Sequence, residues 1–370
     1  DGDLTGVLGY EWMNFRGPER RSSYVSYLKG RALERLTLRT QCVARRFPFD
    51  KERRAIVVEV RDRGSVRVLR ARREIVLCAG ALETPKLLLL SGVGPSEELR
   101  ELGVEPVAHV PEVGKSLHDH PNVTVFFRSS KEIDCKYPQL YGFDRVARGE
   151  GPSDICLVFY PAKSSLREGM MRMIPAIALP EALHREGTAK RILRGAVGKV
   201  LAVGPGGRCV DRVVGVVVIL GKPKSRGTLR LQSADPDLPA RIDPNYLTAP
   251  EDLAMLIAGV QRARQIARSA PLERYTNGEP MPGPLGTNQR NTGDFIKQNL
   301  MTTYHYAGTA RLGADLRSVV DPRLRVRSVT GLRVADASVM PVAPVSALNA
   351  PSMMIGLRGA DFVIEDAAGA

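Results

Sequence analysis

The sequence predicts a mixed α/β fold with two structural regions. In the first region, the apolar run Glu74–Gly80 ends at a glycine and leads directly into a helical pattern. A short continuous apolar run of this kind is typical of a central strand buried on both faces. In the second region, short β-rich segments are followed by 3.6-residue apolar spacing over Glu251–Arg268, which predicts a sheet with covering helices.

Strand and turn signals precede the predicted central strand. Residues 36–48 are expected to form a strand and its exit. Ala55–Val60 and Ser65–Arg70 flank Asp62-Arg63-Gly64, which predicts a hairpin turn whose glycine supplies a positive φ.

A helix is expected directly after the central strand. Thr84 can act as its N-cap, Pro85 suits the first helical position, and Gly92 supplies a left-handed stop. A second short helix is expected over Pro95–Leu102. A strand-to-helix junction aims backbone N–H groups and the helix dipole past the strand end, which suits a phosphate or a ribose.

The second region continues with further strands and helices. Strands are expected at Ile155–Tyr160, Val213–Leu220 and Thr228–Gln232, and a helix near Ala189–Leu201 in a basic stretch. The chain closes with an apolar helix expected over Pro351–Ile364.

Composition excludes several classes of protein. The 370 residues are 43% hydrophobic and 25% charged, which argues against disorder. The longest apolar run, Val213–Leu220, falls well short of the roughly 18 residues that a membrane-spanning helix needs. The chain opens with Asp1 and has no secretory signal, so a processed product or a fragment is expected and the localisation is unknown.

The net charge of +14 would suit an anionic partner. However, the arginines fall on polar positions of alternating segments such as Val66–Arg73. Aromatic residues make up 5% of the chain and do not interleave with the basic clusters as a base-stacking surface would. We therefore expect no nucleic-acid partner.

Cysteines and histidines give no metal or disulfide pattern. The five cysteines (Cys42, Cys78, Cys135, Cys156 and Cys209) are odd in number and form no C-x-x-C pair. His118 and His120 could lie on one strand face as a metal pair, but no third ligand stands nearby at a suitable spacing. No metal is therefore expected.

The sequence lacks the Gly-x-Ser-x-Gly, P-loop, His-Glu-x-x-His and Gly-x-Gly-x-x-Gly motifs. What remains is His305 in an aromatic and small-residue setting, with the carboxamide of Asn349 later in the chain. A histidine and a carboxamide can together bind a substrate hydroxyl, with the imidazole accepting its proton. The alternative is a core histidine and an asparagine that caps the last helix.

Four motif blocks then follow one another along the chain. They are Gly80–Gly94; Val113–Pro121, with a VGxxLxDHP pattern; His305–Gly313, with an HxxGTxxxG pattern; and Val319–Asp321 together with Leu332–Pro341. These blocks resemble the glucose-methanol-choline (GMC) oxidoreductase family of flavoenzymes, in its choline dehydrogenase-like or insect glucose dehydrogenase-like branch. Ser116 stands where the family usually has Asn, and Leu312 stands in a Met position.

The resemblance implies a role for each matching residue. His305 takes the position of the catalytic base, and Asn349 that of the second active-site residue. The residues that match the cofactor-lining positions for FAD are Val43, Ala79, Gly80, Ala81, Asp336, Ala337, Ala350 and Pro351. His118 and His120 become parts of a turn beside the cofactor.

The resemblance also implies the domain organisation. Residues 1–125 are expected to be part of an FAD-binding Rossmann-like domain whose first βαβ unit is missing. Residues 126–295 would form a substrate domain with a mostly antiparallel sheet and covering helices. Residues 296–370 would return to the FAD-binding domain with the catalytic residues. Further departures from the family pattern occur at Ser328, Ala347, Leu357 and Gly359.

The function implied is FAD-dependent oxidation of a small-molecule alcohol to an aldehyde or ketone. The proton would pass to His305 and the hydride to flavin N5, with an electron acceptor that the sequence does not identify. Two alternatives stay open: a catalytically inactive remnant that acts as a binding or structural module without flavin, and a lyase that uses the same histidine without net redox chemistry.

Overall fold

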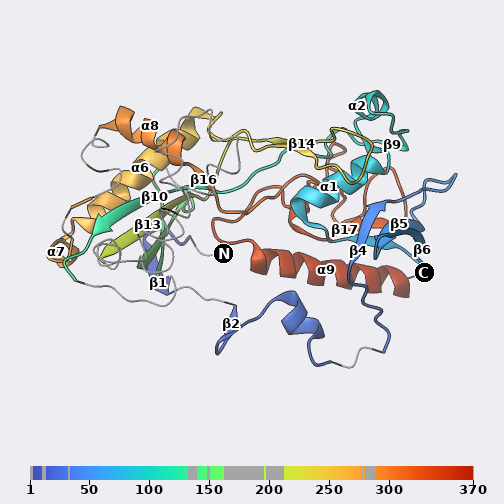
Figure 1. Ribbon diagram of the computed structural model, residues 1–370, viewed down its shortest axis with the longest axis horizontal. Helices are drawn as coiled ribbons and strands as arrows, with labels where there is room; N and C mark the ends of the chain where they lie inside the picture. Colours follow the sequence, from blue (N-terminus) through green and yellow to red (C-terminus); the bar gives the residue numbers. More distant parts are fainter. Residues whose placement is uncertain are drawn as a thin grey trace. The chain divides into compact units, whose positions relative to one another are not determined.

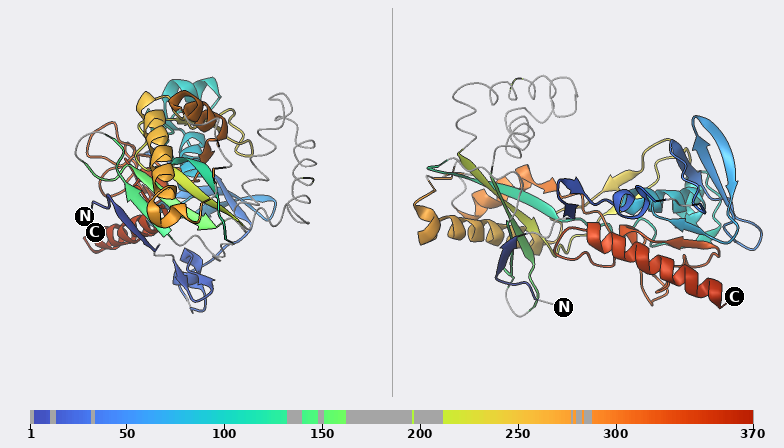
Figure 2. Two further views of the ribbon diagram at one scale, coloured as in Figure 1. Left: turned by 90° about the vertical axis from the view of Figure 1, so that its left-hand side faces the viewer. Right: turned by 90° about the horizontal axis from the view of Figure 1, so that it is seen from below.

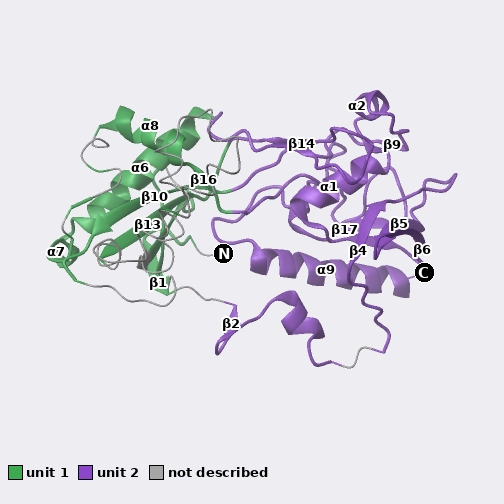
Figure 3. Cartoon of the chain, in the orientation of Figure 1, with its two compact units in different colours: residues 1–12, 120–224, 249–303 green, residues 13–119, 225–248, 304–370 purple. Residues whose placement is uncertain are grey.

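The computed structural model describes residues 3–10, 14–31, 34–131, 140–147, 151–161, 196, 212–276, 278–279, 283 and 288–369. Contacts divide the chain into two compact units (Figure 3). Unit 1 comprises residues 1–12, 120–224 and 249–303, and unit 2 comprises residues 13–119, 225–248 and 304–370. The predicted domain boundaries after residues 125 and 295 stay predictions.

Unit 1 is built on a six-stranded sheet in the order β1-β11-β12-β13-β10-β16 (Figure 1). All of its strand pairs are antiparallel. The strands are β1 (Val7–Tyr10), β10 (Pro121–Arg128), β11 (Leu140–Asp144), β12 (Ile155–Pro161), β13 (Val213–Leu220) and β16 (Met301–Thr302). The predicted strands at 155–160 and 213–220 are therefore confirmed.

One long helix covers this sheet. The helix α6 (Pro250–Ala267) packs on β10, β12 and β13 and against α8 (Gln289–Asn299), as Figures 1 and 2 show. The short helix α7 (Ala270–Glu273) follows α6 in the chain. The buried residues of α6 include Leu256, Val260 and Ala263, at the spacing of one helix face. The helix predicted over 251–268 is confirmed. Gly259 lies at the contact, where a Cβ would stand 2.5 Å from Val218 Cγ1.

Unit 2 combines short sheets with three α-helices. Its strands are β2 (Phe15–Arg16), β3 (Glu19–Arg20), β4 (Cys42–Arg46), β5 (Val57–Asp62), β6 (Ser65–Arg70), β7 (Ile75–Leu77), β8 (Val93–Gly94), β9 (Ala108–His109), β14 (Thr228–Arg230), β15 (Arg241–Asp243) and β17 (Leu332–Val334). Its helices are η1 (Tyr24–Leu28, a π-helix), α1 (Gly80–Leu90), α2 (Ser96–Glu101), η4 (Ala337–Val339, a 3₁₀-helix) and α9 (Asn349–Ala368). A core that includes Leu88, Leu99, Leu332 and Val334 holds it together.

The hairpin and the second short helix form as predicted. β5 and β6 pair antiparallel across a turn in which Arg63 and Gly64 have φ of 49° and 88°. The helix α2 ends before Gly103, whose φ is 74°. The predicted closing helix also forms, as α9, and the structure describes all of its residues. Gly359 is the one buried residue among them.

Two predictions about the junction at residue 80 are wrong. The strand β7 is not buried on both faces, because Val76 is 42% exposed and, in the described part of the chain, β7 pairs only with β17. Thr84 is not an N-cap, since α1 begins at Gly80 with Ala79 as its cap residue and Pro85 inside the helix. The Thr84 hydroxyl instead donates to Asp336. The stop at Gly92, with φ of 82°, is confirmed.

Some of the remaining sequence predictions fall on residues that the structure does not describe. The helix near 189–201, except residue 196, lies outside the described residues, as do Cys135 and Cys209. Cys42 and Cys78 are free thiols. In the described part of the chain, no group of three or more His, Cys, Asp or Glu side chains could hold a metal ion. Among the described helices, none is long and apolar enough to cross a membrane.

The contact between α6 and the sheet gives a test of the packing in unit 1. Gly259→Ala is expected to lower the free energy of unfolding by about 1–3 kcal/mol, because the added methyl meets Val218. Gly293→Ala in α8 is the matched control, since its Cβ would lie 3.5 Å from the nearest atom. The control should be neutral or stabilising by up to about 1 kcal/mol from helix propensity. Urea unfolding measures both, and equal effects would contradict this description of the contact.

Candidate active site

The four motif blocks come together in unit 2, to which all of their residues belong except His120 and Pro121. Ala310 and Leu312 donate their backbone N–H groups to the carbonyls of Ser338 and Val339, at 2.8 Å each. Thr309 donates its hydroxyl to the Ala81 carbonyl at 2.6 Å. The block that begins at His305 therefore runs between η4 and the start of α1.

The block at 113–121 closes this arrangement from another side. His118 and Ala307 form an antiparallel bridge, with N–H to carbonyl distances of 3.1 and 2.9 Å. Gly308 adopts a φ of +87°, and a Cβ there would lie 2.5 Å from the His118 ring and from the Ser116 carbonyl. The close approach of the two segments thus requires a glycine at 308.

Asp336 joins the strand end at residue 80 to the later block. Its Oδ2 accepts the Gly80 N–H at 2.9 Å and the Thr84 hydroxyl at 2.6 Å. Its Oδ1 accepts the Ser338 N–H at 2.8 Å. The carboxylate is buried, so these bonds replace the water that it loses.

The strand end itself is lined by small residues and leaves open space. Gly80 has a φ of +83°, and a Cβ there would meet no atom within 4 Å. Ala79 is exposed and Gly80 is half-buried, while Ala81 and Asp336 are buried. A bound group can therefore approach the backbone at Gly80, because no described atom lies within 4 Å of that position.

His305 lies on the loop that follows β16 and is half-buried. Burial lowers the pKa of its imidazole, and the negative charge of Asp119 partly opposes that shift. The ring is therefore neutral at pH 7 and able to accept a proton. Asp119 also accepts the backbone N–H of His305 at 2.8 Å.

Asn349 begins α9, and it is exposed. Leu348, not Asn349, is the cap residue of that helix. A small buried cluster of Ala307, Met340, Ala343 and Leu348 includes the residue two after His305 and the residue directly before Asn349. One cluster therefore fixes the backbone next to both predicted active-site residues, and Ala350 and Pro351 follow in the first turn of the same helix.

The predicted cofactor residues are distributed more widely than the active-site pair. Ala337 lies in η4, directly after Asp336. Val43 lies on β4 and is 53% exposed. The assignments of the catalytic and cofactor residues stay predictions. Two residues of this site were not predicted from the sequence. Asp119 lies in the His-Asp-His-Pro turn, and Tyr246, whose hydroxyl donates to Asp119, belongs to no motif.

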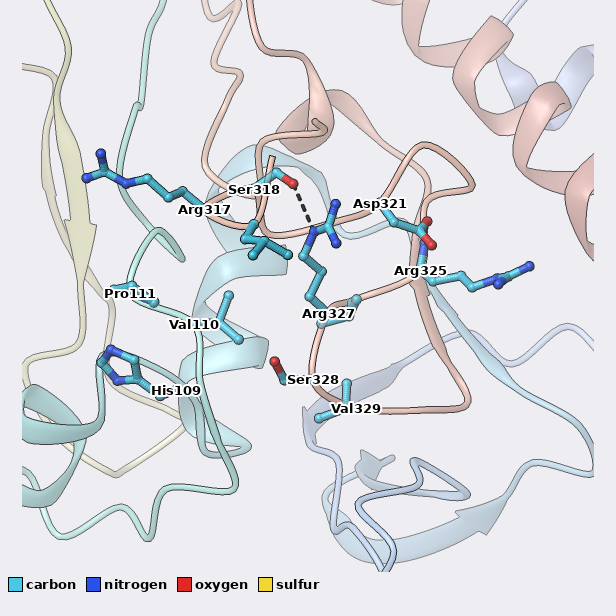
Figure 4. Close-up of a pocket in the computed structure, with 12 residues that line it drawn as sticks. His109, Val110, Pro111, Arg317, Ser318, Asp321, Arg325, Arg327, Ser328 and Val329 are labelled. Atoms are coloured by element: carbon cyan, nitrogen blue, oxygen red, sulfur yellow. Dashed lines mark hydrogen bonds between the residues drawn. The ribbon is translucent and has the colours of Figure 1, made fainter. Parts of the chain in front are cut away.

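A basic pocket of about 530 Å³ lies elsewhere in unit 2 (Figure 4), and neither His305 nor Asn349 lines it. Its arginines already have partners. Arg327 donates to Ser318 Oγ at 3.0 Å, Arg325 to Asp366 at 2.8 Å, and Arg317 is 3.8 Å from Glu112. Arg325 and Arg317 thus pair with carboxylates, whereas Arg327 donates to the neutral oxygens of Ser318 and Gly313.

Comparisons with known proteins identify the family. Two family models described as GMC oxidoreductase match residues 4–122 and 223–356. The chain belongs to the GMC oxidoreductase family, which confirms the resemblance and the mixed α/β fold with an antiparallel sheet.

Individual relatives agree with this assignment. Choline oxidase of Arthrobacter globiformis is 34% identical over 358 residues, which cover 95% of this chain and 60% of the relative. An alcohol dehydrogenase [acceptor] of Pseudomonas putida is 34% identical over 294 residues, covering 79% of this chain and 51% of its own. The chain thus spans less than two thirds of the length of these relatives.

Solved structures show the same fold. Pyridoxine 4-oxidase from Mesorbium loti matches with a TM-score of 0.79 and 24% identity, covering 96% of this chain and 64% of its own. Formate oxidase of Aspergillus oryzae RIB40, in a structure of a single-residue variant, matches with a TM-score of 0.72 and 23% identity. The match covers 88% of this chain and 60% of the formate oxidase chain.

The close approach at Gly308 gives a test of the site. Gly308→Ala is expected to lower the free energy of unfolding by about 2–5 kcal/mol, combining the cost of a left-handed alanine with the clash against His118. Gly64→Ala is the matched control, because Gly64 has a similar φ of +88° but open space at its Cβ. It should cost only about 1–2 kcal/mol. Equal losses in urea unfolding would show that the His118 contact is not tight.

Proposed function

We propose that the protein is an FAD-dependent oxidoreductase that oxidises the CH–OH group of a small alcohol to an aldehyde or ketone. The observation that supports it most directly is the shared cluster of Ala307 and Leu348, which fixes the backbone beside His305 and Asn349. The family membership and the names of its relatives, an alcohol dehydrogenase and a choline oxidase, support the same class of reaction.

In this proposal His305 is the general base. Its lowered pKa keeps the imidazole neutral near pH 7, so that it can accept the substrate hydroxyl proton. The Asn349 carboxamide, exposed at the start of α9, would orient the substrate oxygen through a hydrogen bond. The negative charge of Asp119 favours the imidazolium that forms when the proton arrives.

The residues that would hold FAD are Val43, Ala79, Gly80, Ala81, Asp336, Ala337, Ala350 and Pro351. When bound, FAD supplies the acceptor for the hydride of the substrate carbon. Asp336 would act indirectly, because its oxygens already accept the Gly80 and Ser338 N–H groups and thereby fix the strand end. The substrate class that the relatives favour is choline or another small alcohol. We retain the expectation that nucleic acid is not a partner.

Flavin binding and reduction test this function. The purified protein is mixed with FAD, freed of excess, and exposed without oxygen to choline and to simple primary alcohols. A yellow protein whose flavin absorbance bleaches with one of these alcohols supports the proposal. Absence of bound flavin would favour the inactive remnant. Bound flavin that stays oxidised while the alcohol is consumed would favour a lyase.

Replacement of the base tests the role of His305. His305→Ala is expected to slow flavin reduction by about 10²–10⁴-fold, the usual contribution of a general base. In the unchanged protein, the rate should rise with pH through a midpoint below the ordinary pKa of histidine, because burial lowers the pKa of His305 and the active form is the neutral imidazole. His109→Ala is the control, since that exposed histidine contacts Ser96. A pH profile that His305→Ala leaves unchanged would assign the base elsewhere.

A further inference from the structure

Asp119 occupies a central position beside His305. Its carboxylate is 2% exposed, and Oδ1 accepts the backbone N–H of His305 at 2.8 Å. Oδ2 accepts the hydroxyl of Tyr246 at 2.5 Å. One buried carboxylate therefore links the segment at 119, the loop at 305 and the turn at 246, all within unit 2.

The bond to His305 differs in kind from the neighbouring backbone bridge. The bridge between His118 and Ala307 sets the direction of the loop two residues further on. The Asp119 carboxylate instead holds the amide of the residue that carries the imidazole. A bond to a charged acceptor is stronger than a neutral one, so it fixes the Cα of His305 more firmly.

Backbone strain concentrates around the same carboxylate. Tyr304, directly before His305, has a φ of 61°, and Asn245 and Leu247, on either side of Tyr246, have φ of 53° and 59°. Left-handed conformations are unfavourable for residues with a Cβ and persist only where the surroundings determine them. Both partners of Asp119 therefore lie next to strained residues.

The charge of Asp119 also acts on the imidazole of His305. Asp119 is the charged group whose field raises the pKa of His305 against the effect of burial. The other titratable side chains of the two segments and the turn are His118, His120, Tyr246, Tyr304 and Tyr306. Among these, Tyr246 donates its hydroxyl to Asp119.

We propose that Asp119, itself held by Tyr246, is the positioning residue for His305. It fixes the place of the imidazole through the amide of the same residue and provides a negative charge beside the ring. The expected effect of Asp119 on catalysis rests on the proposed function, in which His305 is the base. The positioning of His305 by Asp119 does not depend on that function.

Two substitutions at residue 119 separate charge from geometry. Asp119→Asn removes the charge but retains an oxygen that can accept the His305 N–H. It should lower the pKa of the His305 imidazole, followed by NMR in a histidine-labelled protein, with little change in exchange of the His305 amide. Asp119→Ala removes both and should also speed that exchange. In flavin reduction, Asp119→Ala should lower kcat by about 10–100-fold, with a smaller change in KM.

Tyr246→Phe is the milder variant, in case Asp119→Ala does not fold. It should lower kcat by less than Asp119→Ala does and speed exchange of the His305 amide, because the carboxylate loses the bond that holds it but retains its charge. Asp321→Asn is the matched control, because Asp321 Oδ1 likewise accepts backbone N–H groups, those of Arg323 and Arg325, at 2.8 and 2.9 Å. The control should leave the His305 titration and its amide exchange unchanged.

The outcomes distinguish this proposal from the proposed function. If Asp119→Asn leaves the titration of His305 unchanged and Tyr246→Phe leaves its amide exchange unchanged, the positioning role is wrong, whatever the activity. If the unchanged protein does not reduce flavin with any alcohol but the NMR readouts shift as expected, the positioning of His305 stands and the assigned reaction fails.

Discussion

The pairing of two short segments, 116–120 and 304–309, is the constraint on which the candidate site depends. Reciprocal backbone bonds between His118 and Ala307 bring the segments together. The approach is so close that a side chain at Gly308 would overlap the His118 ring. Because His305 and Asp119 both lie within these segments, their relation follows from the pairing. A loop histidine thereby acquires a defined position without belonging to a helix or a strand.

A second constraint joins this pair of segments to the strand end at residue 80. Asp336 accepts hydrogen bonds from Gly80, Thr84 and Ser338, and Thr309 reaches the Ala81 carbonyl. The carboxylate thus replaces a conventional cap at the start of α1, which has no side-chain cap bond of its own. The far end of α9 is held by ion pairs: the buried Arg333 contacts both Glu74 and Asp366. The hydrogen bond from Arg333, together with smaller contributions from Arg325 and Arg323, lowers the pKa of the Asp366 carboxyl to about 2.

Local sequence signals predicted local structure well and long-range roles poorly. The hairpin at 62–64, the glycine stop at 92 and the helix at 250–267 all depend on contacts between near neighbours. Thr84 shows the limit, because Ser, Thr and Asp are expected at helix starts, but its hydroxyl finds Asp336, 252 residues away. Val76 shows a second limit, since an apolar run predicts burial only where other elements cover both faces.

The sequence by itself determined the family and the type of many elements, and it predicted the pair His305 and Asn349, because motif blocks and periodicity are written in residue order. Only the tertiary structure decided that Asp119 holds His305 and that Tyr246 holds Asp119. These contacts join residues 186 and 127 positions apart. Such distant bonds leave no periodic or spacing signal, since they depend on how separate segments meet after the chain has folded.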